Sequence, residues 1–134
     1  MVEILIICKD GTFNSYLSTL VISMNLKKKG EDVAVVFMQE GLAALIEKRF
    51  RFSPGLEPYS KDIKDNAAMM GVPSDPFKLI EEANHVGVPL YACQAWRKLL
   101  GGKPPKFDIP EGLEKLELSD LVNEITKSAK VFSI

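Results

Sequence analysis

Two kinds of hydrophobic pattern alternate along the chain. Residues 2–8 and 32–38 are almost continuous aliphatic runs, which are typical of strands covered on both faces of a sheet. Residues 88–92 predict a third, shorter strand that Cys93 closes, and residues 130–134 predict a terminal strand.

Between these runs the apolar positions repeat every three to four residues, as in amphipathic helices. Capping residues and a proline mark where the helices begin. The predicted helices start at Thr12 or Asn14, at Glu40, after Ser74-Asp75-Pro76, at Gln94 and at Ser119-Asp120. Glycines that follow the last apolar positions, Gly30 and Gly87, mark where two of them end.

Both patterns dissolve between residues 50 and 72. Pro54, Gly55, Pro58 and Gly71 punctuate this segment, and helical character is weak even over residues 62–70. A stretch of about 20 residues without a firm pattern is either a functional loop or a partner-binding excursion. We expect an irregular excursion here that acts as a lid or as a docking surface.

The order of the elements predicts the fold class. With 134 residues, the chain is expected to form a single domain over residues 1–134. Strands that alternate with helices predict a three-layer α/β/α domain with a mostly parallel sheet. In such a sheet the functional sites lie at the carboxyl ends of the strands, where both cysteines of this chain are placed.

Composition and charge narrow the function classes. The formal net charge is −1, which argues against a nucleic-acid-binding protein, because phosphate contacts need a basic surplus. No apolar run approaches the roughly 20 residues that cross a bilayer, and residues 1–8 lack the basic start of a signal peptide. We therefore predict a cytoplasmic protein with no membrane contact.

The cysteines are the main candidates for chemistry. Cys8 and Cys93 are far apart in sequence and form no CxxC pair, and the chain has one histidine. These counts predict no metal site, and a reducing cytosol disfavours a structural disulfide. Any use of the cysteines is therefore expected to be reactivity.

Cys93 has the better position for reactivity. It directly precedes a helix, so the backbone N–H groups of Gln94 and Ala95 favour an anionic sulfur. Arg97 follows four residues later, on the same helical face if Cys93 is in the first turn. The alternative is that Cys93 is a small buried hydrophobic residue, which is a common role of free cysteine.

The segment around Cys93 also resembles a known family. Residues 87–95, Gly-Val-Pro-Leu-Tyr-Ala-Cys-Gln-Ala, are similar to the block around the sulfur-carrying cysteine of DsrE/DsrF-like sulfur-relay proteins. Three further segments resemble that family and occur in the same order: residues 4–11, residues 33–42 and the C-terminal residues 119–134. The resemblance covers most of the chain except residues 50–72. No single motif is specific, so the resemblance rests on the occurrence of all these segments in the same order.

The resemblance implies a function. It implies a five-stranded DsrEFH-like sheet and a carrier that holds sulfane sulfur as a persulfide on Cys93, without a cofactor. Donor and acceptor thiols on other proteins are the implied partners, and trimers or hexamers are the implied assembly. Some members are labelled peroxiredoxin-like, and Cys8 is the candidate second thiol if it approaches Cys93 across the sheet edge.

Other residues carry weaker hypotheses. Asp10, Gly11 and Thr12 form a turn before a helix where an anion can bind, although helix capping is the simpler interpretation. His85, near the end of a helix, is expected to have a surface or capping role rather than a catalytic one. Trp96 either shields the sulfur or fills the core.

A basic and aromatic cluster spans residues 48–52. Lys48, Arg49 and Arg51 stand beside Phe50 and Phe52. Such a cluster suits contact with a partner or an RNA, but a solvated face anchored by two rings is the commoner arrangement.

Three alternatives to a sulfur carrier remain open. A binding module would use the turn from Lys9 to Asn14 for a nucleotide or anion and leave Cys93 inert. A scaffold subunit would also leave Cys93 unreactive, within a heteromeric assembly. A redox thiol enzyme would require a disulfide between Cys8 and Cys93 or between two chains.

Overall fold

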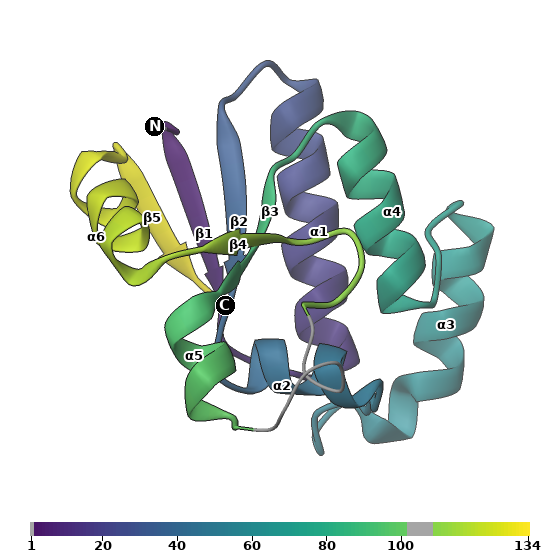
Figure 1. Cartoon of the computed structure of the whole chain (residues 1–134). Coiled ribbons are helices and arrows are strands. Elements are labelled where there is room, and N and C mark those ends of the chain that lie inside the picture. The colour runs from purple at the N-terminus through teal and green to yellow at the C-terminus, as the bar shows by residue number, and fades with distance from the viewer. Residues whose placement is uncertain (1, 102–108) are drawn as a thin grey trace.

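The sheet has five strands, all parallel, and confirms the predicted α/β class (Figure 1). The structure is a computed structural model that describes residues 2–101 and 109–134. The strands are β1 (Ile4–Cys8), β2 (Val33–Phe37), β3 (Leu90–Cys93), β4 (Glu114–Leu116) and β5 (Lys130–Ser133). Their order across the sheet is β4-β3-β2-β1-β5, so β2 lies at the centre.

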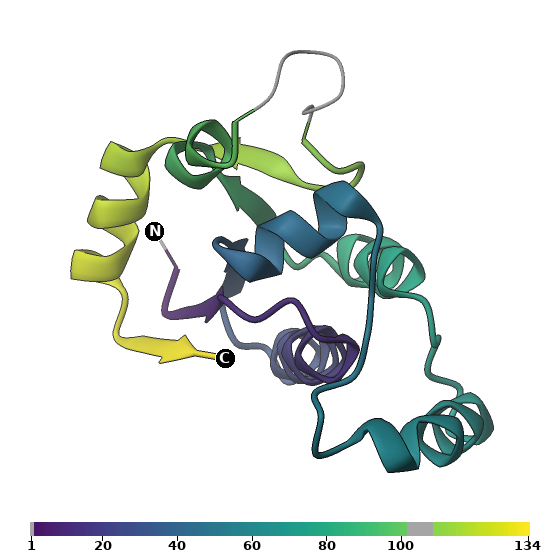
Figure 2. The same ribbon diagram turned by 90° about the horizontal axis from the view of Figure 1, so that it is seen from below.

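Helices cover both faces of the sheet and its carboxyl edge (Figure 2). They are α1 (Phe13–Lys28), α2 (Glu40–Glu47), the 3₁₀ helix η1 (Glu57–Tyr59), α3 (Ser60–Met69), α4 (Pro76–Val86), α5 (Gln94–Leu99) and α6 (Leu118–Lys127). Helices α1 and α4 lie on one face, α5 and α6 on the other, and α2 crosses the carboxyl edge. Among the described residues, no helix is long and apolar enough to span a bilayer.

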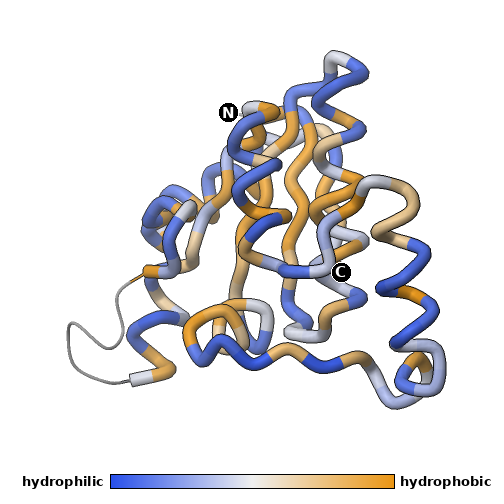
Figure 3. Tube along the Cα trace, turned by 90° about the vertical axis from the view of Figure 1, so that its right-hand side faces the viewer, coloured by the Kyte–Doolittle hydropathy of each residue, from blue (hydrophilic) through white to orange (hydrophobic). Residues whose placement is uncertain are grey.

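Two hydrophobic clusters fill the spaces between these layers, and Figure 3 shows that hydrophobic residues gather in the central strands. The larger cluster lies between the sheet and α1 and α4, and includes Leu20, Val35 and Leu79. The smaller cluster lies on the α5/α6 face and includes Leu5 and Val36. The alternation of side chains along each strand assigns them to one face or the other.

Capping residues begin α1 and α4 and end α4 as the sequence predicts, whereas α6 begins at Leu118, with Glu117 as its N-cap, and not at Ser119-Asp120. Thr12 is the N-cap of α1, and its side chain accepts a hydrogen bond from the Ser15 N–H. Asp75 caps α4 by accepting from the Phe77 N–H at 2.9 Å. Gly87 ends α4 with a φ of 98°, in the left-handed region that favours glycine.

The expectation of an irregular segment at residues 50–72 is corrected. Most of it is helical, as η1 and α3. Helix α3 is polar on most sides and buries only Ala67, so its hydrophobic periodicity is too weak to reveal it.

Strand β4 was not identified from the pattern either. Its sequence is Glu-Lys-Leu, and only Leu116 is buried, because β4 is a short strand at the edge of the sheet. Two polar residues out of three leave too little hydrophobic pattern to predict it.

Two glycines seat α2 against the carboxyl edge. A Cβ on Gly11 would lie 2.4 Å from the Glu40 carbonyl oxygen, and a Cβ on Gly41 would lie 2.4 Å from that of Cys8. The Gly41 N–H donates to the Lys9 carbonyl at 2.9 Å. Only glycine permits these backbones to approach so closely, so both positions fix the end of the sheet where the candidate site lies.

Candidate functional site

Cys93 lies where the sequence analysis expected it, at the carboxyl end of β3. It pairs with Leu116 of β4 and is the N-cap residue of α5, with φ −66° and ψ 115°. The chain therefore turns from strand to helix directly at the sulfur-bearing residue.

The Cys93 side chain is buried on the face of the sheet that carries α5 and α6. It is 1% exposed and belongs to the smaller cluster, together with Val36 and Leu116. Ala95 and Trp96, both half-buried, pack against the same cluster. Trp96 also packs against the larger cluster, so it joins the two cores as well as contributing to the cover of this face.

Gln94 and Arg97 form a polar pair next to Cys93. Gln94 is 4% exposed, and its Oε1 accepts a hydrogen bond from Arg97 Nε at 3.4 Å. The Gln94 Nε2 is buried and has no hydrogen-bond partner among the described residues. A buried donor without an acceptor is uncommon in proteins, and among the described residues Thr19 Oγ1 and Ser128 Oγ are also buried without a partner.

The sequence suggests a role only for the backbone N–H of Gln94 and does not reveal this buried side-chain amide. A glutamine after a strand gives no signal of burial. Its burial becomes visible only once α5 folds back over the sheet.

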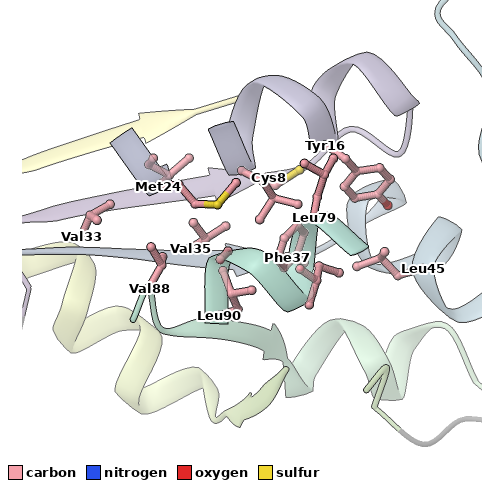
Figure 4. Close-up of a cluster of buried hydrophobic side chains, with 14 of the residues drawn as sticks. Cys8, Tyr16, Met24, Val33, Val35, Phe37, Leu45, Leu79, Val88 and Leu90 are labelled. Carbon is pink, nitrogen blue, oxygen red and sulfur yellow. The ribbon is translucent and has the colours of Figure 1, made fainter. Parts of the chain in front are cut away.

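Cys8 ends β1 but faces the other side of the sheet (Figure 4). It pairs with Phe37, which pairs with Ala92, so Cys8 and Ala92 share the α1/α4 face while Cys93 faces α5 and α6. Cys8 and Cys93 are two strands apart, about 9–10 Å at the usual strand spacing. A disulfide needs Cα atoms within about 7 Å, so this fold does not fit a direct Cys8–Cys93 bond.

The thiol of Cys8 is also poorly suited to nucleophilic chemistry. Burial raises its pKa to about 11, and the Thr19 hydroxyl offsets only part of this effect. The Sγ–H donates to the Asp10 carbonyl at 3.5 Å, an interaction that only the protonated thiol can make. At neutral pH almost no thiolate is present, and the thiolate is the reactive form.

The turn at Asp10, Gly11 and Thr12 already holds an anionic group. The Asp10 carboxylate accepts hydrogen bonds from Ser15 Oγ at 2.6 Å and from Thr12 Oγ1 at 2.9 Å. Burial opposes ionisation of Asp10, but these hydrogen bonds outweigh it and lower its pKa. A phosphate at this helix end would meet a resident negative charge, which favours the capping interpretation.

The remaining candidates lie apart from Cys93. His85 is exposed in the last turn of α4, and residues 48–52 lie beside the start of α1. Helix α3 stands on the α1/α4 side, so the segment 50–72 is not a lid over Cys93 (Figure 2). Within the described part of the chain, no three His, Cys, Asp or Glu side chains are grouped so as to hold a metal ion.

Comparison with known proteins identifies the fold. The chain is similar to the crystal structure of the ychN protein from E. coli, a DsrE/DsrF-like fold, with a TM-score of 0.68 and 14% sequence identity. The similarity covers 100% of each chain. A scan of protein-family models and a search of curated proteins found no match. At this identity the likeness shows the fold and not the activity.

Proposed function

We propose that this chain is a DsrE-like sulfur-relay protein that carries sulfane sulfur as a persulfide on Cys93. The observation that carries the proposal is the position of Cys93 at the carboxyl end of β3, followed directly by Gln94, whose buried Nε2 has no hydrogen-bond partner among the described residues. The similarity of fold to ychN supports the same assignment. The acceptor in this function is the thiol of another protein.

The chemistry needs no cofactor. The Cys93 thiolate attacks the outer sulfur of a donor persulfide, the donor S–S bond breaks, and the donor leaves as a thiolate. Cys93 then carries the outer sulfur. An acceptor thiolate attacks that sulfur in turn, and Cys93 leaves as a thiolate, so the two exchanges involve no net oxidation or reduction.

Gln94 and Arg97 give this intermediate its partners. The outer sulfur of a persulfide carries negative charge and accepts hydrogen bonds. An unsatisfied buried donor costs about 1–3 kcal/mol, and a sulfur that accepts from Gln94 Nε2 would recover part of this cost in the loaded state only. The bond from Arg97 holds the amide in place and brings a positive charge to the same end of α5.

Access to the sulfur requires α5 to open. Cys93 is 1% exposed, and α5 has only six residues, with Leu99 70% exposed at its end. Short, weakly packed elements open locally at much lower free energy than the whole domain. A donor or acceptor that binds the exposed end of α5 would favour the open state, which couples partner docking to sulfur exchange.

The assembly we propose is a homo-oligomer, a trimer or a hexamer. Helix α6 has an apolar stripe of which Leu121 is buried, whereas Leu118, Val122 and Ile125 are 55%, 49% and 40% exposed. A contiguous exposed apolar stripe of this kind is typical of an interface. It lies on the face of the sheet that also holds Cys93.

The experiment is a transfer cycle with variants of the site. The protein is loaded with glutathione persulfide, desalted and discharged to an acceptor thiol, and bound sulfane sulfur is measured by cyanolysis at each stage. Wild type and Cys8→Ser should each bind about one sulfur per chain and release it, and Cys93→Ser should bind none.

Gln94→Leu separates the proposed role of the amide from a purely structural one. The Cys93 persulfide of this variant should have a shorter lifetime than that of wild type. The variant should nevertheless unfold at an equal or higher urea concentration, because an unsatisfied buried donor has been removed. An unchanged persulfide lifetime in Gln94→Leu would remove Gln94 from the mechanism, and loading in Cys93→Ser would contradict the function itself.

A further inference from the structure

A cleft of about 470 Å³ opens at the carboxyl edge, on the face of the sheet opposite Cys93. It lies between the starts of α1 and α4, the end of α2 and the helix α3. Figure 2 shows the chain leaving α2 and passing the start of α1 on its way to α3. The volume is within the range of sites for small organic molecules.

The wall of the cleft is aromatic and fixed. The rings of Phe13 and Phe52 are 5.0 Å apart, and the ring of Phe50 is 5.7 Å from that of Phe77. The backbone is held as well, because the Phe13 N–H donates to the Arg51 carbonyl at 2.8 Å. Phe13 and Phe52 are 3% and 6% exposed and support the wall from behind, so the half-buried ring of Phe50 offers the aromatic surface that a flat or apolar group can contact.

Three cations line the cleft: Lys48, Arg51 and Lys64. Within residues 2–101 and 109–134, none of these three cations forms an ion pair. A neighbouring lysine of α3, Lys61, does form a salt bridge, with Asp65. Lys64 Nζ lies 5.9 Å from the centre of the Phe52 ring. The positive groups thus stand directly beside the apolar wall.

Two carboxylates also line the cleft, those of Glu57 and Asp75. The Asp75 carboxylate caps α4 through the Phe77 N–H, so it is engaged with the backbone of its own helix. With three cations against two carboxylates, the lining retains a positive charge. Hydroxyl groups of Ser60 and Ser74 add neutral hydrogen-bonding partners.

Lys48 occupies its position against backbone preference. It is the C-cap of α2 with φ 57° and ψ 39°, a left-handed conformation in which glycine is favoured. A lysine at this position keeps a cation at the rim of the cleft where a glycine would suit the backbone better.

We propose that this cleft binds a small organic anion with a flat, apolar body and a carboxylate or phosphate head. The body packs against the half-buried ring of Phe50, and the head is held by Arg51, Lys48 and Lys64. The site is separate from the chemistry at Cys93 and does not depend on it.

The test uses two probes that differ in charge, 2-naphthoate and the neutral 2-naphthalenemethanol, with calorimetry and amide chemical shifts as readouts. Naphthoate should bind more tightly, with shifts at the residues of the cleft. Arg51→Gln and Lys48→Gly should each weaken it about tenfold, since a charge-assisted hydrogen bond contributes at least that factor. Lys61→Gln, on the same helix as Lys64 but outside the cleft, is the matched control and should bind as wild type does.

Several results would overturn the proposal. Absence of naphthoate binding at millimolar concentration, equal affinity for the two probes, or an equal loss in Lys61→Gln would each do so. Shifts confined to the apolar groove between α1 and α3, around Leu17 and Ile63, would place the ligand elsewhere and equally contradict it. Sulfur loading on Cys93 is measured separately, so either proposal can fail while the other stands.

Discussion

At the scale of single residues, the two cysteines differ in their surroundings more than in their burial. Cys8 is 0% and Cys93 1% exposed. Cys8 lies in the larger apolar cluster beside Tyr16, whereas Cys93 is followed by a buried amide with a free donor and by an arginine that contacts this amide. Burial raises the pKa of the Cys8 thiol and keeps it protonated, whereas Cys93 adjoins a polar pair at the start of α5, which is why the two thiols are expected to have different chemistry.

The raised pKa of Cys8 makes stability depend on pH in alkaline solution. Its thiol ionises near 9 when unfolded and at about 11 when folded, so the unfolded state loses its proton first as the pH rises. The contribution is present below pH 9 and is lost between pH 9 and 11, by about 2–3 kcal/mol. Urea unfolding of wild type and Cys8→Ala across this range should show a shallower decline in the variant; parallel declines would contradict the assignment.

At the scale of elements, the position of α2 depends on close contacts between backbones. Gly41→Ala places a Cβ against the Cys8 carbonyl, so it should lower the free energy of unfolding by about 1–3 kcal/mol. Gly55→Ala is the matched control, since a Cβ there meets nothing within 4 Å, and it should change stability by less than about 0.5 kcal/mol. Chemical denaturation measures the free energy of unfolding of both variants. Equal changes in Gly41→Ala and Gly55→Ala would contradict the account, because they would show that the backbone near Gly41 accommodates a Cβ without loss of stability.

Elements with strong local signals could be predicted from the sequence. The starts of α1 and α4 follow from Thr12 and Asp75, and β1 and β2 follow from their aliphatic runs. Helix α3 and strand β4 could not be predicted in this way. Their residues are mostly exposed, and packing against neighbours, rather than their own pattern, determines their structure.

The candidate site could be predicted in part. The position of Cys93 between strand and helix follows from local patterns. The face of the sheet on which its side chain lies does not. Whether Cys8 and Cys93 share a face depends on the register of β1, β2 and β3, which pairs Cys8 with Phe37 and Phe37 with Ala92. A shift of one residue would reverse the result, and no local pattern in the sequence specifies it.

At the scale of the whole molecule, the two faces of the sheet are covered unequally. The α1/α4 face holds the larger cluster, while α6 leaves most of its apolar stripe exposed. If this stripe is the interface of a homo-oligomer, Val122→Lys should give a smaller assembly in sedimentation velocity, because a charge would be buried without a partner. The neighbouring exposed change Asn123→Lys should leave the assembly intact, and a monomeric wild type would contradict the proposed interface.

The most direct measurement of the central claim is the intact mass of the reduced protein after incubation with polysulfide. The account predicts a gain of one sulfur, about 32 Da, in wild type and in Cys8→Ser, and no gain in Cys93→Ser. No adduct on wild type, together with slow alkylation of Cys93 at neutral pH, would contradict the claim that this chain carries sulfur.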